Sequence, residues 1–491
     1  MKLISRLAIL LLLAYSCSSE KEQKFNSVDN FSSELKELKE YFQIPGMAVL
    51  VQKEGETLYE DYLGYSETAT QSQLDASTTF PIASLTKIFS GLMIMKLAEE
   101  GKLKPEDPIK KYIPEAEIDD SIQIKHVLSH TSQGDIGKHF YYSSRFGWLT
   151  KVIEKASGMS FAEYAETLIL SPLEMQNSFL LKDSLQLAQK DIKMARPYML
   201  DDGIQDGFID YGYSSSAGMV STVKDLAVLD RAMDANTIIS EASRDKMFSA
   251  FKELPYGYGI FHQEFNDLNL IWGYGQYDCY SSLFLKVPSK KITLILLANN
   301  NLMSDPARLI YGDALSSLFV MSFLKNFVFE IEDMPLLETE ASLAENKSIT
   351  SDFYREKLLA QALAESFMAR FDTGKVQSSA RLLEKTFSLF PDYKTYADIS
   401  LMHNLSFLKD VAFFMELGDF NVFDEQLETI GNALLSEDPD NPYLHTYLGT
   451  FYDRKGDLEK AKPHFEHIVN NANFSRNWYT AEAEGWLRGQ Q

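Results

Sequence analysis

FPIASLTK, residues 80–87, opens a long apolar run that continues to Leu103. Apolar residues recur within the run at helical spacing, at Phe89, Leu92, Met93 and Leu97. No charged residue interrupts positions 88–95. The pattern predicts a buried helix whose first turn carries Ser84 and Lys87.

Ser84 and Lys87 are three positions apart and therefore share one helix face. Burial and the positive helix end both disfavour an ammonium, so Lys87 can act as a neutral base for the Ser84 hydroxyl. The helix start also offers a free backbone amide to a developing oxyanion. The spacing alone is weak, because it recurs at Ser33/Lys36, Ser221/Lys224, Ser243/Lys246 and Ser406/Lys409. The apolar context distinguishes Ser84 as a candidate nucleophile.

The composition limits the classes of function. A chain of 491 residues predicts two or three domains. Its formal net charge of −23, without a Lys/Arg-rich patch, argues against nucleic acid as a partner.

The first residues predict export. A basic start and a short apolar segment end at Ala14-Tyr15-Ser16-Cys17, and a polar stretch follows. Residues 1–17 resemble a bacterial lipoprotein leader in which Cys17 is lipidated, and residues 18–30 form a tether. A plain signal peptide or an uncleaved anchor remains an alternative. We expect a protein of the cell envelope, at the periplasmic or outer cell surface, held to a membrane by its lipid.

Few other residues are candidates for a disulfide, a second nucleophile or a metal site. Cys279 is the only other cysteine, so lipidation of Cys17 leaves no intramolecular disulfide, and Cys279 is expected to be buried rather than nucleophilic. His126 and His130 are four positions apart, but no carboxylate or cysteine pattern completes a metal site. We expect two structural histidines and no metal or organic cofactor.

Further segments, taken in order, resemble the serine β-lactamase and penicillin-binding-protein superfamily, in its branch of class C-like enzymes and esterases. They are Phe80–Lys87, Glu99–Leu103 with Asp107-Pro108, Ile124–Ser132, Tyr142-Ser143-Ser144, Val152–Gly158, Ser171–Met175, Ala217–Thr222 and Asp225-Leu226. The resemblance implies an α+β fold for residues 31–330, an antiparallel sheet flanked by helices with an all-helical subdomain at about residues 103–211.

The strand pattern agrees with this expectation. Residues 46–53 and 57–64 predict two strands joined by a hairpin turn at Glu54-Gly55, after a helix at residues 33–42. Residues 268–272, 281–287 and 291–298 predict the late strands of the domain.

The resemblance also implies roles for the site residues. Ser84 is the acylated nucleophile, Lys87 is its base or proton relay, and the phenol of Tyr142 can exchange protons with the nucleophile or the leaving group. Ser144 occupies a position where the family has a substrate-contacting asparagine.

The third family motif has a basic residue at the position of Gly273, followed one residue later by a glycine, here Gly275. The stretch Gly273-Tyr274-Gly275-Gln276 therefore lacks the family's cation, and the backbone amide of Gln276 is the expected second oxyanion donor. Because family members use that cation to hold a substrate carboxylate, its absence favours an esterase or amidase for substrates without that anion. The expected substrate is a small-molecule or peptidoglycan-like acyl compound.

The last third of the chain predicts helices. Residues 331–348 are acidic and polar, as in a linker. Within residues 349–491, Leu448-Gly449, Tyr452, Gly456-Asp457, Ala461 and Phe465 fall at tetratricopeptide offsets, and Gly374-Lys375 and Gly418-Asp419 suggest degenerate repeats. We expect an all-α, tetratricopeptide-like domain that binds a peptide or protein partner or packs against the enzyme.

Two functions remain open at this point. The leading hypothesis is a β-lactamase-related serine hydrolase that acts on an ester or amide through a Ser84 acyl-enzyme. The alternative is a catalytically eroded, membrane-tethered binding or sensor protein of the same fold, because the second and third motifs depart from the family.

Overall fold

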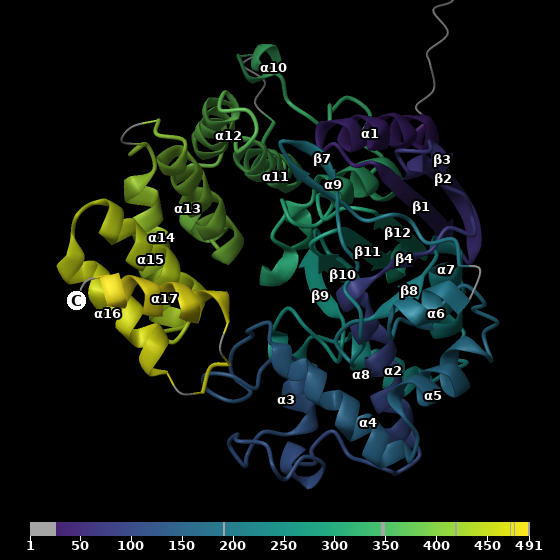
Figure 1. Ribbon diagram of the computed structural model, residues 1–491. Coiled ribbons are helices and arrows are strands. Elements are labelled where there is room, and N and C mark those ends of the chain that lie inside the picture. Colours follow the sequence, from purple (N-terminus) through teal and green to yellow (C-terminus); the bar gives the residue numbers. More distant parts are fainter. Residues whose placement is uncertain are drawn as a thin grey trace, which may run out of the picture.

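The structure is a computed structural model that describes residues 26–189, 192–344, 349–417, 420–471, 473–475 and 477–489. Figure 1 shows a sheet with helices on its faces and a second, helical array of the C-terminal residues beside it. The predicted leader, Cys17 and most of the predicted tether lie outside the described residues, as do Gly418 and Asp419. Within the described part of the chain, no helix is both long enough and apolar enough to cross a bilayer.

The main sheet is antiparallel and, among the described residues, has seven strands in the order β3-β2-β1-β12-β11-β10-β9. Their bounds are β1 Gly46–Lys53, β2 Glu56–Glu67, β3 Ser72–Gln73, β9 Phe261–Phe265, β10 Leu268–Tyr277, β11 Tyr280–Val287 and β12 Ile292–Ala298. The first two strands form the predicted hairpin, and Glu54 and Gly55 both have the positive φ that its two-residue turn requires. The predicted late strands are confirmed, and β10 continues through the third family motif.

Both faces of the sheet are covered, which explains the nearly continuous apolar sequence of its central strands. On β1, Val49 packs in one core cluster and its neighbour Leu50 in another. The first cluster includes α1 (Ser27–Tyr41) and α9 (Leu318–Phe323), and the second includes α2 (Thr86–Glu99). Because α2 is buried nearly all round, the predicted buried helix is confirmed.

The region between residues 103 and 211 is mainly helical. Its helices are η2 Ile109–Lys111, α3 Ile124–Leu128, η3 Ser144–Trp148, α4 Leu149–Ser157, α5 Phe161–Ala165, η4 Glu166–Leu170 and α6 Ser184–Gln189. The expectation of an all-helical subdomain is wrong in detail, because β6 (Tyr198–Asp201) and β7 (Gly203–Asp206) form a hairpin and β5 (Phe179–Leu180) pairs with β8 (Met219–Ser221). Two further helices, α7 Val223–Asp234 and α8 Glu241–Phe248, precede β9.

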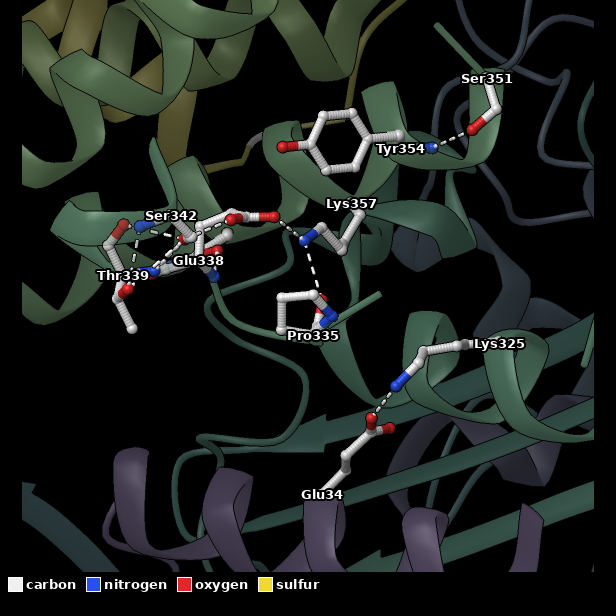
Figure 2. Close-up of polar contacts among 10 residues, drawn as sticks. Glu34, Lys325, Pro335, Glu338, Thr339, Ser342, Ser351, Tyr354 and Lys357 are labelled. Atoms are coloured by element: carbon white, nitrogen blue, oxygen red, sulfur yellow. Dashed lines mark hydrogen bonds and ion pairs between the residues drawn. The ribbon is translucent and has the colours of Figure 1, made fainter. Parts of the chain in front are cut away.

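Buried ion pairs hold the segment that follows the sheet, between about residues 324 and 338, in contact with neighbouring helices (Figure 2). Glu34 of α1 pairs with Lys325 of η9 (Leu324–Val328), and Glu338 pairs with Lys357 of α11 (Asp352–Met368). The Lys357 ammonium also donates to the carbonyl oxygen of Pro335 at 2.9 Å. The part of the predicted linker around Glu338 is therefore packed against the body of the protein.

The C-terminal region is an array of helices: α10 Glu340–Ala344, α11 Asp352–Met368, α12 Lys375–Leu389, α13 Ile399–Phe414, α14 Asp424–Glu437, α15 Pro442–Arg454, α16 Leu458–Asn470 and α17 Trp478–Gly489. Gly449 of α15 faces Phe465 of α16, and a Cβ at this glycine would lie 2.9 Å from the ring. The tetratricopeptide offsets thus correspond to a close contact between two neighbouring helices.

Polar contacts join this helical region to the rest of the protein. Arg145, which is buried, donates to the Ser475 hydroxyl at 2.9 Å and to the Asn473 carbonyl oxygen at 2.8 Å. Tyr141 donates to the Asp438 carboxylate at 2.5 Å, and the hydroxyls of Tyr311 and Tyr447 are hydrogen-bonded. The two regions therefore share a specific, largely buried interface.

Candidate active site

The turn that carries Ser84 is held against the sheet. Ser84 lies in η1 (Ala83–Leu85), directly before α2, and Ala83 has a positive φ of 45°. The Ser282 hydroxyl of β11 donates to the Ile82 carbonyl oxygen at 2.8 Å. A Cβ at Gly275 would lie 2.0 Å from the same oxygen, so a glycine is required where β10 passes the turn. The backbone strain at Ala83 is thus imposed by tertiary contacts.

The side chains of Ser84 and Lys87 meet. The Lys87 Nζ lies 2.8 Å from the Ser84 Oγ and 3.1 Å from the Ser216 carbonyl oxygen. Lys87 is only 4 % exposed, and burial lowers the pKa of its amine to about 7. A large share of the molecules therefore carry a neutral amine at neutral pH, placed to accept the hydroxyl proton.

Tyr142 completes the group. Its ring centroid lies 4.8 Å from the Lys87 Nζ, and its phenol interacts with the Ser84 side chain. Burial raises the pKa of the phenol above its ordinary value. Tyr142 therefore keeps its proton and can donate it, whereas Lys87 is the group that can be a base.

The two histidines have structural partners. His130 stacks on Tyr142 at a centroid distance of 4.3 Å, and its Nδ1 accepts from the Ser143 backbone N–H at 3.0 Å. Burial, with Lys87 nearby, holds the pKa of His130 well below its usual range, so the ring is neutral. The Nδ1 of His126 accepts from the Gln123 N–H at 3.1 Å. Among the described residues, no cluster of side chains suited to a metal ion occurs.

A pocket of about 340 Å³ opens onto the nucleophile. It is lined by Ser84, Tyr142, Asp210, Tyr274, Gln276, Tyr277, Asp278, Arg308, Leu309, Ile310 and Trp478. A larger cavity of about 780 Å³, lined in part by Arg231, Arg244 and Lys286, does not include Ser84 in its lining. The smaller pocket is therefore the candidate active site.

The predicted site residues do not all reach this pocket. Ser84, Tyr142, Tyr274 and Gln276 line it, and Lys87 lies behind Ser84. Gly273 instead packs against Leu85 and Ile88, and Gly275 against the nucleophile turn, so their role is to bring the strand close. Ser144 is exposed at the start of η3 and is absent from the lining, so the resemblance misplaced it as a substrate contact. The lipidation site Cys17 lies outside the described residues.

Sequence reasoning missed five charged or aromatic pocket residues, Asp210, Tyr277, Asp278, Arg308 and Trp478. None belongs to a recognisable motif, and Trp478 comes from the C-terminal helical region. Arg308, on the loop after β12, places a cation in the pocket although the third family motif has none. Cys279 is buried, and burial raises the pKa of its thiol, as expected for an unreactive cysteine.

The comparisons with known proteins agree with this geometry. A family model described as Beta-lactamase matches residues 31–316. The chain is 27% identical over 304 residues to penicillin-binding protein 4* of Bacillus subtilis (strain 168), an alignment that covers 51% of this chain and 67% of that protein. It is 26% identical over 305 residues to protein flp of Staphylococcus aureus (strain MW2), covering 52% of this chain and 60% of flp. The matched part thus spans about two thirds or less of these relatives.

Solved structures are similar as well. The octameric penicillin-binding protein homologue from Pyrococcus abyssi superposes with a TM-score of 0.56 and 25% identity, covering 68% of this chain and 81% of that one. The D-amino acid amidase from Ochrobactrum anthropi SV3, complexed with L-phenylalanine amide, gives a TM-score of 0.50 at 18% identity, covering 56% and 91%. The second likeness concerns the fold alone.

Proposed function

Because this chain belongs to the Beta-lactamase family, whose members include serine hydrolases, we propose that it hydrolyses an ester or amide through an acyl-enzyme on Ser84. One observation carries the proposal: the Ser84 hydroxyl and a buried amine of lowered pKa lie 2.8 Å apart at the floor of a pocket. A buried lysine without a carboxylate partner is costly to the fold, so its retention beside a hydroxyl supports a chemical role.

Acylation follows from these positions. The Lys87 amine takes the proton of Ser84 while the Oγ forms a bond to the substrate carbonyl carbon. The carbonyl oxygen becomes an oxyanion, for which the backbone amides of Ser84 and Gln276 are the proposed donors. When the intermediate collapses, the bond to the leaving alcohol or amine breaks, and the leaving group receives a proton from Lys87, directly or through the phenol of Tyr142.

Deacylation reverses the proton path. Water attacks the acyl carbon, and its proton passes to the Lys87 amine. The bond between the acyl carbon and the Ser84 Oγ then breaks, and Lys87 returns the proton to that oxygen, which releases a carboxylic acid and restores the enzyme. All the proton transfers use groups within the Ser84, Lys87 and Tyr142 cluster.

The proposal also has a cellular part. We propose that the chain is exported and anchored in the cell envelope through a lipid on Cys17, which the sequence of residues 1–17 supports. In that setting, peptidoglycan-like acyl compounds and small esters are the candidate substrates, and the C-terminal helices are a candidate surface for a peptide or protein.

An active-site probe tests the catalytic proposal. A fluorophosphonate or β-lactam probe, followed by peptide mass mapping, is expected to label Ser84 in the full chain and to leave Ser84→Ala unlabelled. The rate of turnover by the full chain is then compared for small acyl esters, a D-Ala-D-Ala peptide and a cephalosporin. Should Ser84 remain unlabelled while Ser84→Ala hydrolyses the esters as fast as the wild type, the acyl-enzyme is excluded. The protein would then be better described as a catalytically eroded binding or sensor protein.

A further inference from the structure

Trp478 is the one residue of the C-terminal helical region in the described lining of the Ser84 pocket. It begins α17, and its backbone N–H donates to the Asn477 Oδ1 at 2.9 Å. Its ring stacks on Tyr443 at a centroid distance of 6.2 Å and contacts Tyr479 edge-on at 5.6 Å. The indole is therefore held in place by its own region and forms a fixed wall of the pocket.

Arg308 faces this wall from the other region. Its guanidinium carbon lies 5.6 Å from the Trp478 ring centroid, and its backbone is left-handed with a φ of 48°. The nearest carboxylate in the described structure, that of Asp305, is 3.9 Å away, which is too far for a hydrogen bond. The Nε–H of Arg308 is buried and has no hydrogen-bond partner among the described residues. The guanidinium also interacts with the Tyr311 hydroxyl, but the Arg308 side chain is 34 % exposed, so its remaining N–H groups are available to a ligand.

The same two side chains also line a second cavity, of about 190 Å³, between the helical region and the loop after β12. Trp478 and Arg308 therefore stand at the boundary between the nucleophile pocket and the interface. Without the helical region, this side of the pocket would lack its aromatic wall. The site is incomplete unless both regions are present.

Resting on the hydrolase function above, we propose that Trp478 and Arg308 form a substrate subsite shared by the two regions, which takes a carboxylate carried on a planar or apolar group. A guanidinium binds a carboxylate through paired charge-assisted hydrogen bonds. The indole, with Leu309 and Ile310 beside it in the lining, offers an apolar surface for the group that carries the anion. Trp478 is thereby a specificity-determining residue.

The pocket also contains two carboxylates, which would repel an anion. Asp210 and Asp278 interact with each other, and burial together with Asp278 raises the pKa of the Asp210 carboxyl. An ammonium-bearing substrate would favour this pair, whereas a carboxylate-bearing one would favour Arg308. A comparison of the two substrate types therefore separates the subsite from its main competitor.

Matched esters provide the test. We would measure kcat/KM of the full chain for 4-nitrophenyl esters of terephthalic acid, of its monoamide and of 4-(aminomethyl)benzoic acid, with 4-nitrophenyl acetate as a small reference. The carboxylate ester is expected to exceed the carboxamide ester by about tenfold or more, the range of one hydrogen-bonded charge pair. In Arg308→Gln this ratio is expected to fall to about one, and Arg308→Lys should retain part of it.

Trp478→Leu should lower kcat/KM for the aromatic esters more than for 4-nitrophenyl acetate, because the small acetyl group has less surface to place against the indole. Arg381→Gln and Trp486→Phe are the matched controls, since both residues lie in the helical region outside the pocket lining. Preference for the ammonium ester, or a carboxylate preference unchanged in Arg308→Gln, would overturn the subsite.

A binding measurement separates failure of the subsite from failure of the hydrolase function. Calorimetric titration of Ser84→Ala with monomethyl terephthalate, which has one carboxylate, and with methyl 4-carbamoylbenzoate, which has none, needs no turnover. Tighter binding of the carboxylate compound that disappears in the Ser84→Ala, Arg308→Gln double variant supports the subsite even if no ester is hydrolysed. If ester hydrolysis depends on Ser84 but the two compounds bind equally well, the hydrolase function is supported and the subsite is refuted.

Discussion

The rate at which Ser84 is acylated should depend on pH through the Lys87 amine. Burial lowers the pKa of this amine to about 7. Such an amine is about one-tenth neutral at pH 6 and about nine-tenths neutral at pH 8. If the neutral amine is the base, acylation should rise about tenfold between these two values and level off above about pH 8. An ordinary lysine, with a pKa of about 10.4, would give a rate that still rises at pH 10.

The assay is the second-order rate of Ser84 labelling by a fluorophosphonate between pH 5 and pH 10. Lys87→Met should label about 10²–10⁴-fold more slowly, the usual contribution of a positioned base. Lys96→Met is a matched control, because Lys96 is on the same helix but partly exposed and ion-paired with Glu99. This control should keep the midpoint near pH 7.

The same pKa predicts a stability effect of definite sign. The folded protein holds Lys87 neutral above about pH 7, while the unfolded chain keeps this proton up to about pH 10.4. Between these values the unfolded state binds more protons, so the free energy of unfolding should rise with pH relative to Lys87→Met. A labelling rate that climbs without levelling to pH 10, or a Lys87→Met variant that labels at the wild-type rate, would refute the reasoning.

Further predictions concern the packing around the active site, the contact with the helical region and the lipid anchor. Gly275→Ala should lower the free energy of unfolding by about 1–3 kcal/mol and abolish Ser84 labelling, because its Cβ would lie 2.0 Å from a backbone oxygen. Thermal unfolding measures the change in stability. The control is Gly485→Ala, which should be neutral or stabilising because the space around Gly485 is open. Arg145→Ala should lower the free energy of unfolding by about 2–3 kcal/mol and speed hydrogen exchange in residues 473–475, because it removes the hydrogen bonds that hold this segment. Unchanged exchange would contradict this role of Arg145. Cys17→Ala should lose incorporation of labelled palmitate, and equal labelling would remove the lipoprotein proposal.

Local sequence patterns predicted the parts of the fold that depend on local physics. The hairpin at Glu54-Gly55 follows from the positive φ that its turn needs, and the buried character of α2 follows from its apolar residues. The meeting of Ser84 and Lys87 follows from helical spacing, because a three-residue separation fixes which side chains can touch.

The rest of the pocket depends on contacts between distant segments. Arg308 follows a strand in a loop without any motif, and Trp478 begins a helix that belongs to another part of the fold. Only packing of the helical region against the loop after β12 brings them together, and no periodicity in the sequence encodes that contact. Ser144 shows the opposite error, since a match in motif position did not place its side chain in the pocket.

The order of the chain has a consequence for biosynthesis. Ser84 is synthesised long before Trp478, which lies 394 positions later in the sequence. A nascent chain can fold its nucleophile turn only after β10 and β11 have emerged, and its pocket gains the indole later still. If Trp478 selects the substrate as proposed, a newly synthesised molecule therefore acquires its nucleophile turn before its selectivity.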